Sequence, residues 1–162
     1  MSINTGLFTS ETDMWATPQP FFDKLNDEFG FTLDVCATAD NAKCEKYFTP
    51  EVDGLVQVWQ GVCWMNPPYG REIGKWIAKA CNEAQWGRAT VVCLLPARTD
   101  TKYWHQYIWD KQNHKPRPGV GVRFLEGRLK FGDSKGSAPF PSAVVVFENA
   151  LIKWLDERGA VV

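Results

Sequence analysis

The sequence predicts an α/β fold with a mostly parallel sheet and an antiparallel strand pair near the carboxyl terminus. Three consecutive segments carry this prediction: an apolar run at residues 62–65, an apolar stripe at helical spacing at 71–86, and a second apolar run at 89–95. A strand, a helix and a strand at this spacing form a right-handed crossover, which makes the two strands parallel. The second run is apolar throughout, as is typical of a central strand that is covered on both faces.

Length and composition indicate one globular unit. The chain has 162 residues, so we expect a single domain over residues 1–162, large enough to bury one core. Residues 1–13 are polar and acidic, and we expect them to form a flexible segment rather than a signal peptide. No apolar run is long enough to span a membrane. Unpaired cysteines in apolar surroundings are typical of a reducing compartment, so the protein is expected to be cytoplasmic.

The cysteines and histidines do not predict a metal site. The five cysteines are widely spaced, there is no Cys-x-x-Cys motif, and the chain has only two histidines. A zinc site needs a closer set of ligands, so we expect no metal, and we interpret most of the cysteines as reduced core residues.

The first helix is expected to follow Thr17, which can cap it, with Pro18 in its first turn and Gly30 at its end. The next segment, residues 31–36, has the pattern of a buried strand, and Asp34 is out of place in it. A carboxylate at the end of a buried strand can accept hydrogen bonds from a ligand. Residues 42–60 are irregular apart from a short strand at 47–48, so any second strand in this region must be reduced or lost.

The second half of the chain continues the alternation. After the strand at 89–95 we expect a helix at 101–111 that turns Trp104 inward, and then a mobile basic loop at 113–121. Two short strands flank Gly127, and a buried strand and a terminal helix follow; their expected ranges are 122–126, 128–131, 142–147 and 150–158.

The turn after the run at 62–65 carries the most specific chemistry, in the motif Asn66-Pro67-Pro68-Tyr69. Two prolines stop the strand and restrict the residues before them, which makes a rigid turn at the carboxyl edge of the sheet, where α/β folds bind ligands. Asn66 offers an amide oxygen and Pro67 a main-chain oxygen, and two such acceptors can take both hydrogens of an exocyclic amine. The nitrogen lone pair then leaves conjugation and becomes nucleophilic. Tyr69 can stack on the ring that carries the amine.

The charge is distributed unevenly along the chain. Residues 1–60 contain three basic and ten acidic side chains, a net charge of −7, whereas residues 98–135 contain nine basic and four acidic ones, a net charge of +5. A basic segment in a nearly neutral protein suits a phosphate backbone that lies along one face. The candidate DNA contacts are Arg98, Lys102, Lys115 and Arg117.

The proline motif and the segments around it resemble the compact phage-type (Dam-like) DNA N6-adenine methyltransferases. The resemblance runs from about Trp15 to Phe147, with Trp-Ala-Thr-Pro at 15–18, Leu-Asp-Val-Cys-Ala at 33–37, Leu-Pro-Ala-Arg-Thr-Asp-Thr at 95–101, Gly-Arg-Leu-Lys-Phe at 127–131 and Ala-Pro-Phe-Pro-Ser-Ala at 138–143. It implies a Rossmann-like class I methyltransferase fold and methyl transfer from S-adenosylmethionine to the N6 amine of adenine in DNA, within the cytoplasm of the host cell if the protein is encoded by a phage.

The resemblance also implies a set of site residues. Asn66, Pro67, Pro68 and Tyr69 form the catalytic motif, and Phe140 is expected to stack on the base opposite Tyr69. The expected cofactor contacts are Trp15, Thr17, Pro18, Asp34, Cys36, Ala37 and Asp53, the last toward the adenosine. The glycine-rich turn that the family usually has after the first strand is replaced here by residues 37–41. Two alternatives stay open: the same chemistry on an RNA adenine or a protein glutamine, and a nucleic-acid-binding module without catalysis.

Overall fold

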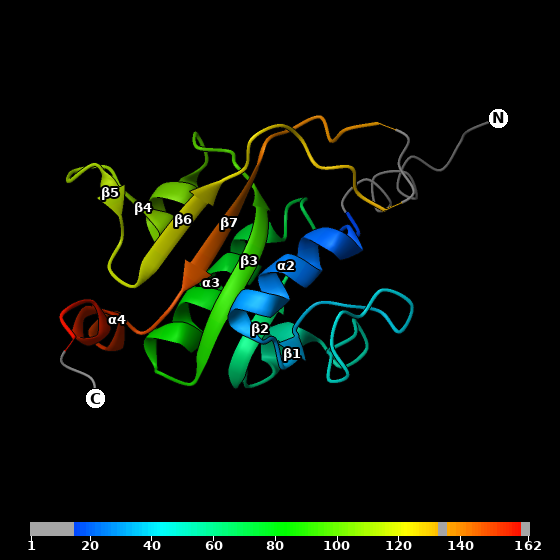
Figure 1. The fold of residues 1–162 in the computed structure, drawn as a ribbon, viewed down its shortest axis with the longest axis horizontal. Helices are drawn as coiled ribbons and strands as arrows, with labels where there is room; N and C mark the ends of the chain where they lie inside the picture. The colour runs from blue at the N-terminus through cyan, green and yellow to red at the C-terminus, as the bar shows by residue number, and fades with distance from the viewer. Residues whose placement is uncertain (1–14, 133–135, 160–162) are drawn as a thin grey trace.

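A five-stranded sheet forms the centre of the protein. The structure is a computed structural model that describes residues 15–132 and 136–159. The strand order across the sheet is β1-β2-β3-β7-β6 (Figure 1). The strands are β1 (Leu33–Asp34), β2 (Gly61–Met65), β3 (Ala89–Pro96), β7 (Ser142–Phe147) and β6 (Val120–Phe124).

The direction of the strands agrees with the predicted α/β class. β1, β2 and β3 are mutually parallel, β7 is antiparallel to β3, and β6 is antiparallel to β7. Only β7 therefore runs against the other four strands. The carboxyl ends of β1, β2 and β3 meet at one edge of the sheet, which we call the carboxyl edge.

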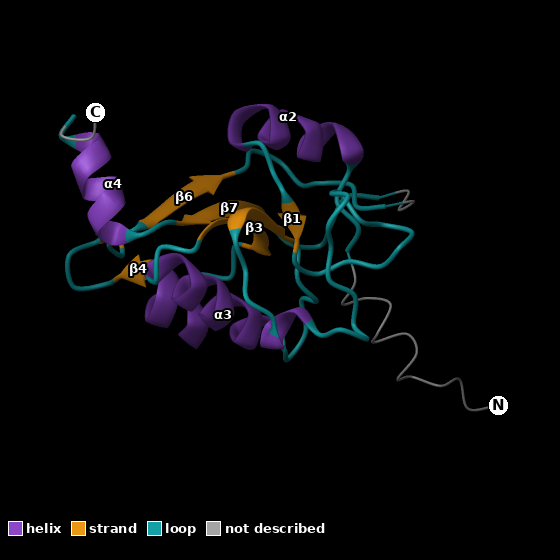
Figure 2. Ribbon diagram, turned by 90° about the horizontal axis from the view of Figure 1, so that it is seen from below, coloured by secondary structure: helices purple, strands orange, loops and turns teal. Residues whose placement is uncertain are grey.

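Helices cover the two faces of the sheet. Figure 2 shows α2 (Gln19–Phe29) on one face and α3 (Ile73–Gln85) on the other. Both helices occur where the apolar spacing predicts them, because Phe22 and Leu25 on α2, like Ile77 and Ala80 on α3, are buried. The last helix, α4 (Ala150–Glu157), lies at the side of the sheet and buries none of its residues.

The central strands are the most buried part of the molecule. β3 and β7 pair over six positions, from Val91 opposite Phe147 to Pro96 opposite Ser142. Every residue of β7 is buried, and so is almost all of β3. The continuous apolar runs in the sequence are therefore explained by a strand pair that has no solvent-exposed face.

Several predicted elements differ in the structure. The segment 101–111 is helical only over residues 102–108, with a short π-helix at Trp104–Ile108, and Trp104 is buried as predicted. The rest of the segment differs: β4 (Trp109–Asp110) follows and pairs with β5 (Lys115–Pro116). The Nε2 atom of His105 lies 2.6 Å from the Thr99 carbonyl oxygen, and the Arg117 guanidinium donates to the carbonyl of His105. These contacts and the β4–β5 ladder take the place of regular α-helical hydrogen bonds in this segment. The predicted mobile loop at 113–121 consequently includes half of a hairpin.

The third difference is residues 128–131, which lie outside any strand. β7 already pairs with β3 on one side and with β6 on the other, so residues 128–131 cannot pair with β7 as a further strand. Earlier in the chain, the predicted strand at 47–48 is reduced to one parallel bridge between Asp34 and Tyr47. Thr17 is also not the cap of α2: Pro18 occupies the N-cap position, without a side-chain hydrogen bond.

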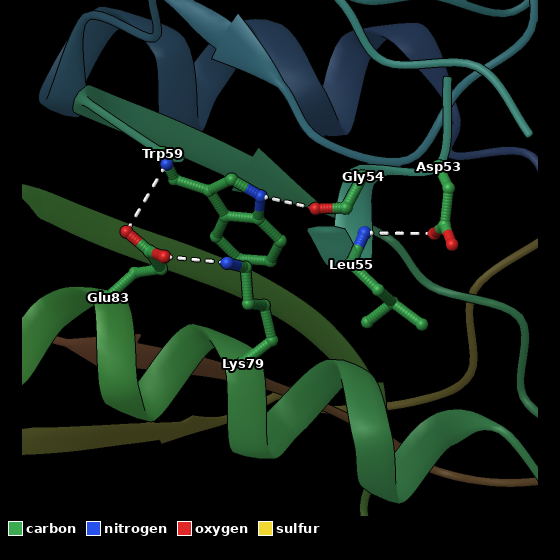
Figure 3. Close-up of polar contacts among 6 residues, drawn as sticks. All are labelled: Asp53, Gly54, Leu55, Trp59, Lys79 and Glu83. Carbon is green, nitrogen blue, oxygen red and sulfur yellow. Dashed lines mark hydrogen bonds and ion pairs between the residues drawn. The ribbon is translucent and has the colours of Figure 1, made fainter. Parts of the chain in front are cut away.

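The segment between β1 and β2 is fixed by a group of polar contacts around Trp59 (Figure 3). The indole Nε1 of Trp59 donates to the carbonyl of Gly54 at 2.8 Å, and its main-chain N–H donates to Glu83 on α3 at 3.2 Å. Lys79, one turn earlier on α3, donates to the other carboxylate oxygen of Glu83 at 2.6 Å. This network attaches residues 54–59 to α3 and so determines how β2 enters the sheet.

Candidate functional site

A pocket opens at the carboxyl edge, where β1 and β2 end. Its walls come from residues 15–17 before α2, from residues 34–43 at and after β1, and from the turn after β2. About 60 Å³ of it is open to a water molecule, far less than the roughly 300–1,000 Å³ of pockets that hold small molecules. A nucleoside-sized ligand therefore requires the walls to move apart. The pocket is lined by Trp15, Ala16, Thr17, Asp34, Cys36, Asn41, Lys43, Trp64, Asn66 and Pro67.

Asn66 follows β2 directly, and its amide group is held in one orientation. The Nδ2 atom donates to the carbonyl of Trp15 and, at 2.9 Å, to the hydroxyl of Thr17. Because a carbonyl oxygen can only accept, the Trp15 contact requires the nitrogen of the amide on that side. The Oδ1 atom is buried and has no hydrogen-bond partner among the described residues. The side chain therefore offers a free acceptor at the carboxyl edge.

Asp34 lies at the end of β1 and is 2 % exposed. Its two oxygens accept main-chain N–H groups, Oδ1 from Cys36 at 3.2 Å and Oδ2 from Lys43 at 3.0 Å. Burial raises the pKa of the Asp34 carboxyl to about 6, although these two hydrogen bonds and the charge of Lys43 oppose the shift. The carboxylate therefore shapes the loop that follows β1 as well as forming part of the pocket wall.

The structure adds pocket residues that the sequence did not single out: Ala16, Asn41, Lys43 and Trp64. Lys43 brings a positive charge to the wall, and its Nζ donates to the Gln19 side chain at 2.7 Å. The Oδ1 of Asn41 accepts the N–H of Thr38 at 2.7 Å, which closes the turn that stands in place of a glycine-rich one. The signal for both residues is their position in the loop directly after a buried strand.

Four of the seven expected cofactor contacts line this pocket, namely Trp15, Thr17, Asp34 and Cys36. The other three do not. Pro18 begins α2, Ala37 is buried and donates its N–H to the Phe48 carbonyl, and Asp53 is exposed and accepts the N–H of Leu55 (Figure 3). Cofactor contact by Pro18, Ala37 and Asp53 stays a prediction.

The catalytic motif is divided between the pocket and an aromatic cluster. Pro67 is buried on the pocket wall, and Pro68 is half-buried. The Tyr69 ring is 7 % exposed, and its hydroxyl donates to the Leu94 carbonyl at 2.9 Å. Burial holds the pKa of the Tyr69 phenol well above its ordinary value, so this hydroxyl stays protonated.

Phe140 lies next to Tyr69, but the two rings do not form opposite walls of a base pocket. Their centroids are 5.5 Å apart and the planes meet at 72°. A base between two rings needs near-parallel planes about 7 Å apart, twice the ~3.4 Å rise of stacked bases. Trp15 and Phe131 complete the cluster, each with its centroid within 6 Å of that of Phe140. The structure thus corrects the expected arrangement: a base can enter between Tyr69 and Phe140 only if the rings separate.

The four predicted DNA contacts fall at two places. Arg98 and Lys102 follow β3 at the carboxyl edge, and the Arg98 guanidinium lies 5.8 Å from the centroid of Phe140. Lys115 and Arg117 instead precede β6 and share a groove with α4, which follows the end of β7. Because β7 runs against β3, this is the opposite edge of the sheet. The basic segment therefore does not form one face, and DNA contact by Lys115 and Arg117 stays a prediction.

The part of the chain that the structure describes has neither a group of metal ligands nor a membrane-spanning helix. Within residues 15–132 and 136–159, no three His, Cys, Asp or Glu side chains are grouped closely enough to hold a metal ion. None of the helices in the same part of the chain has the length and hydropathy needed to cross a membrane.

Comparison with known proteins agrees with the geometry. The family model described as DNA N-6-adenine-methyltransferase (Dam) matches residues 4–159. A protein named DNA N-6-adenine-methyltransferase from Haemophilus phage HP1 is 38% identical over 142 residues, which cover 86% of this chain and 80% of that protein. Its namesake from Escherichia phage T1 is 30% identical over 148 residues, covering 79% of this chain and 61% of the relative. With a proline-rich turn, a free amide oxygen and a carboxylate at one sheet edge, and with a match over nearly its whole length, the chain belongs to the DNA N-6-adenine-methyltransferase (Dam) family.

Proposed function

We propose that Asn66 and the main-chain carbonyl of Pro67 receive the N6 amine of an adenine in DNA and make it reactive toward a methyl donor. The family of the chain gives the reaction, which is methylation of adenine at N6 in DNA. The names of the relatives support DNA adenine over the two other acceptors considered from the sequence, an RNA adenine and a protein glutamine.

One observation carries the assignment to Asn66: its Oδ1 atom is buried without a partner among the described residues. A buried acceptor that lacks a hydrogen bond costs roughly 1–3 kcal/mol. The fold maintains this cost, because Trp15 and Thr17 hold the nitrogen end of the amide and leave the oxygen free. An N–H donor from a ligand removes the cost, and an exocyclic amine provides such a donor.

S-adenosylmethionine is the proposed methyl donor, and the pocket residues suit its charged groups. Asp34 and the Trp15 carbonyl are acceptors for an ammonium group, while Lys43 is a cationic partner for a carboxylate. When it is bound, the cofactor supplies a methyl group on a positively charged sulfur. The small volume of the pocket means that Trp15 and the loop after β1 must shift to admit the adenosine part.

The residues of the chain act by position and polarity. Asn66 Oδ1 and the Pro67 main-chain oxygen accept hydrogen bonds from the two N–H groups of the amine. This arrangement turns the nitrogen lone pair out of conjugation with the ring. Fixed acceptors of this kind would stabilise the positive charge that develops on the nitrogen as the nitrogen–carbon bond forms and the sulfur–carbon bond of the donor breaks. One N–H proton would then pass to water, which leaves a neutral methylated amine. The rigid double-proline turn keeps both acceptors in place during the reaction, so little reorganisation is needed.

The fold supports two further proposals. Three parallel strands followed by an antiparallel β7 and by β6 are consistent with the Rossmann-like class I methyltransferase arrangement. The buried residues of the five strands, α2 and α3 belong to one hydrophobic cluster, which supports a single methyltransferase domain. The expectation for residues 1–13 lies outside the described residues, and cytoplasmic location stays a prediction.

Replacing Asn66 tests the proposal. Asn66→Ala should reduce N6-methyladenine formation by roughly 100- to 1,000-fold, the usual effect of losing one preorganised polar group. Binding of S-adenosylmethionine, measured by calorimetry, should change by no more than about threefold, because the nine other residues of the pocket wall remain.

The matched control is Asn82→Ala, an exposed amide on α3 away from the pocket. The control should methylate DNA at the wild-type rate. Wild-type methylation by Asn66→Ala, with a normal unfolding temperature, would exclude the role given to Asn66.

A further inference from the structure

A second and larger depression lies beside the pocket, between the start of α3 and the segment 101–107. It is an open groove with a volume of about 650 Å³, compared with about 60 Å³ for the pocket. One wall consists of Gly70, Arg71 and residues of the first turns of α3, and the other includes Lys102, Tyr103 and Tyr107. Lys102 is the only groove residue among the site residues predicted from the sequence, and the family match gives the groove no role.

The groove carries positive charge on both walls. Arg71 and Lys102 are exposed, one on each wall, and neither forms an ion pair with any residue in 15–132 or 136–159. A third cation, Lys75, is paired with Glu72 at 2.9 Å. The two unpaired charges therefore face the space between the walls, which favours an anionic occupant.

The same walls supply neutral hydrogen-bond donors. Tyr103 and Tyr107 are half-buried with part of each side chain on the groove. Burial raises the pKa of the Tyr103 phenol above its ordinary value, although the interaction with the Thr101 side chain and the charge of Arg98 oppose the shift. A protonated phenol beside an Arg or Lys is a common combination for phosphate oxygens.

The groove is also close to the candidate amine acceptors. Pro67 belongs to the pocket wall and Gly70 to the groove wall, and three residues span at most about 11 Å. Phosphates of one DNA strand follow one another every ~3.4 Å along the duplex axis. A strand that delivers an adenine to Asn66 therefore has phosphates within a few nucleotides that reach this groove.

We propose that the groove between Arg71 and Lys102 binds the phosphate backbone of the DNA strand that carries the target adenine. Arg71 and Lys102 each contact a phosphate from opposite sides, and the two tyrosines donate to its oxygens. The proposal rests on the proposed function, because it needs an adenine in the pocket to place the strand. It accounts for strand positioning in a chain in which two of the four predicted DNA contacts, Lys115 and Arg117, lie at the opposite edge.

The test uses the double variant Arg71→Ala/Lys102→Ala and a short adenine-containing DNA duplex. We expect DNA affinity at low salt, measured by fluorescence anisotropy, to fall roughly 10- to 100-fold. The slope of log affinity against log salt should decrease in magnitude by about 2, close to one for each phosphate contact. S-adenosylmethionine binding and the unfolding temperature should not change, because both side chains are exposed and outside the pocket.

The control is Lys24→Ala/Arg88→Ala, which removes the same charge from α2 and from the loop before β3. It should keep the wild-type salt slope. If the wild-type protein methylates DNA and the Arg71/Lys102 variant keeps both its affinity and its slope, the groove does not bind the strand. If the wild-type protein bound to S-adenosylmethionine does not methylate adenine at all, the proposed function fails first and the groove proposal fails with it.

Discussion

At the scale of single residues, the site depends on side chains whose partners are main-chain groups. Asn66 is oriented by the Trp15 carbonyl, Asp34 accepts two main-chain N–H groups, and the Tyr69 hydroxyl donates to the Leu94 carbonyl. These partners belong to the backbone, so they persist whatever the neighbouring side chains are. These polar contacts are therefore in place before any ligand binds, as electrostatic preorganisation requires, whereas the pocket walls still have to move apart to admit a ligand.

The buried carboxyl of Asp34 should make stability depend on pH. Its pKa is raised by burial to about 6 from 3.8, so between these values the folded protein keeps a proton that the unfolded chain loses. The contribution of Asp34 to stability is then greatest below pH 4 and decreases as pH rises to 6, by about 1.4 kcal/mol per pH unit and roughly 3 kcal/mol in all. We expect the free energy of unfolding of the wild type, relative to that of Asp34→Asn, to decrease by this amount between pH 4 and pH 7.

Urea unfolding at several pH values measures this difference. Asp156→Asn, which removes one exposed carboxylate on α4, provides the baseline for an unrelated loss of charge. A difference between wild type and Asp34→Asn that stays constant from pH 4 to pH 7 would show that burial does not govern this carboxyl.

At the scale of elements, the loops after β1 and β2 are fixed by close packing. Gly54 lies against the residue that follows β1, and a Cβ atom there would be 2.2 Å from the Val35 carbonyl oxygen and 3.2 Å from the Trp76 ring. The carbonyl of the same glycine accepts the Trp59 indole, and Glu83 holds the Trp59 main chain (Figure 3). The short segment 54–59 thus joins β1, α3 and β2, and it positions the edge where the pocket opens.

Gly54→Ala should destabilise the protein by roughly 2–3 kcal/mol, because the added carbon overlaps main-chain atoms that cannot move independently. Gly74→Ala is the matched control: its Cβ would be 4.0 Å from Tyr103, and alanine favours a helix over glycine by up to about 1 kcal/mol. Chemical denaturation of both variants checks the prediction. Equal stabilities for the two variants would contradict it.

At the scale of the whole molecule, the two edges of the sheet carry different structural features. The carboxyl edge holds the pocket, the aromatic cluster and the proposed phosphate groove, whereas the opposite edge carries α4 and the β4–β5 hairpin beside it. A single hydrophobic cluster connects the two edges through β3 and β7. The proposed site at one edge therefore rests on a core that is continuous across the sheet.

A single core should unfold in one step. The largest fully buried side chains include Trp59, Trp64 and Trp104, which lie on different elements, so tryptophan fluorescence reports on most of the core. We expect unfolding followed by fluorescence and by far-ultraviolet circular dichroism to have the same midpoint. Amide hydrogens of α4 should exchange faster than those of α3, because α4 buries no residue. Two separate fluorescence transitions would contradict a single domain.

The central part of the fold could be predicted because its signals are local. Residues 62–65 and 89–95 are apolar runs, and residues 71–86 have helical spacing, so the parallel crossover follows from neighbouring residues alone. Asn66 and Asp34 could be assigned to one edge because each follows a strand of the same parallel set. The helix predicted at 101–111 ends at residue 108, because Arg117 donates to the His105 carbonyl and residues 109–110 pair with β5.

By itself, the sequence determined the α/β class, the parallel core and the edge at which Asn66 and Asp34 meet. Only the tertiary structure decided which end of the Asn66 amide is free, that Tyr69 and Phe140 meet edge to face, and that the basic segment is divided between two edges. The physical reason is the distance along the chain between the partners. Strand and helix patterns repeat within a few residues, whereas the Trp15 carbonyl reaches Asn66 from 51 residues away, a contact that exists only once the sheet and α2 have packed.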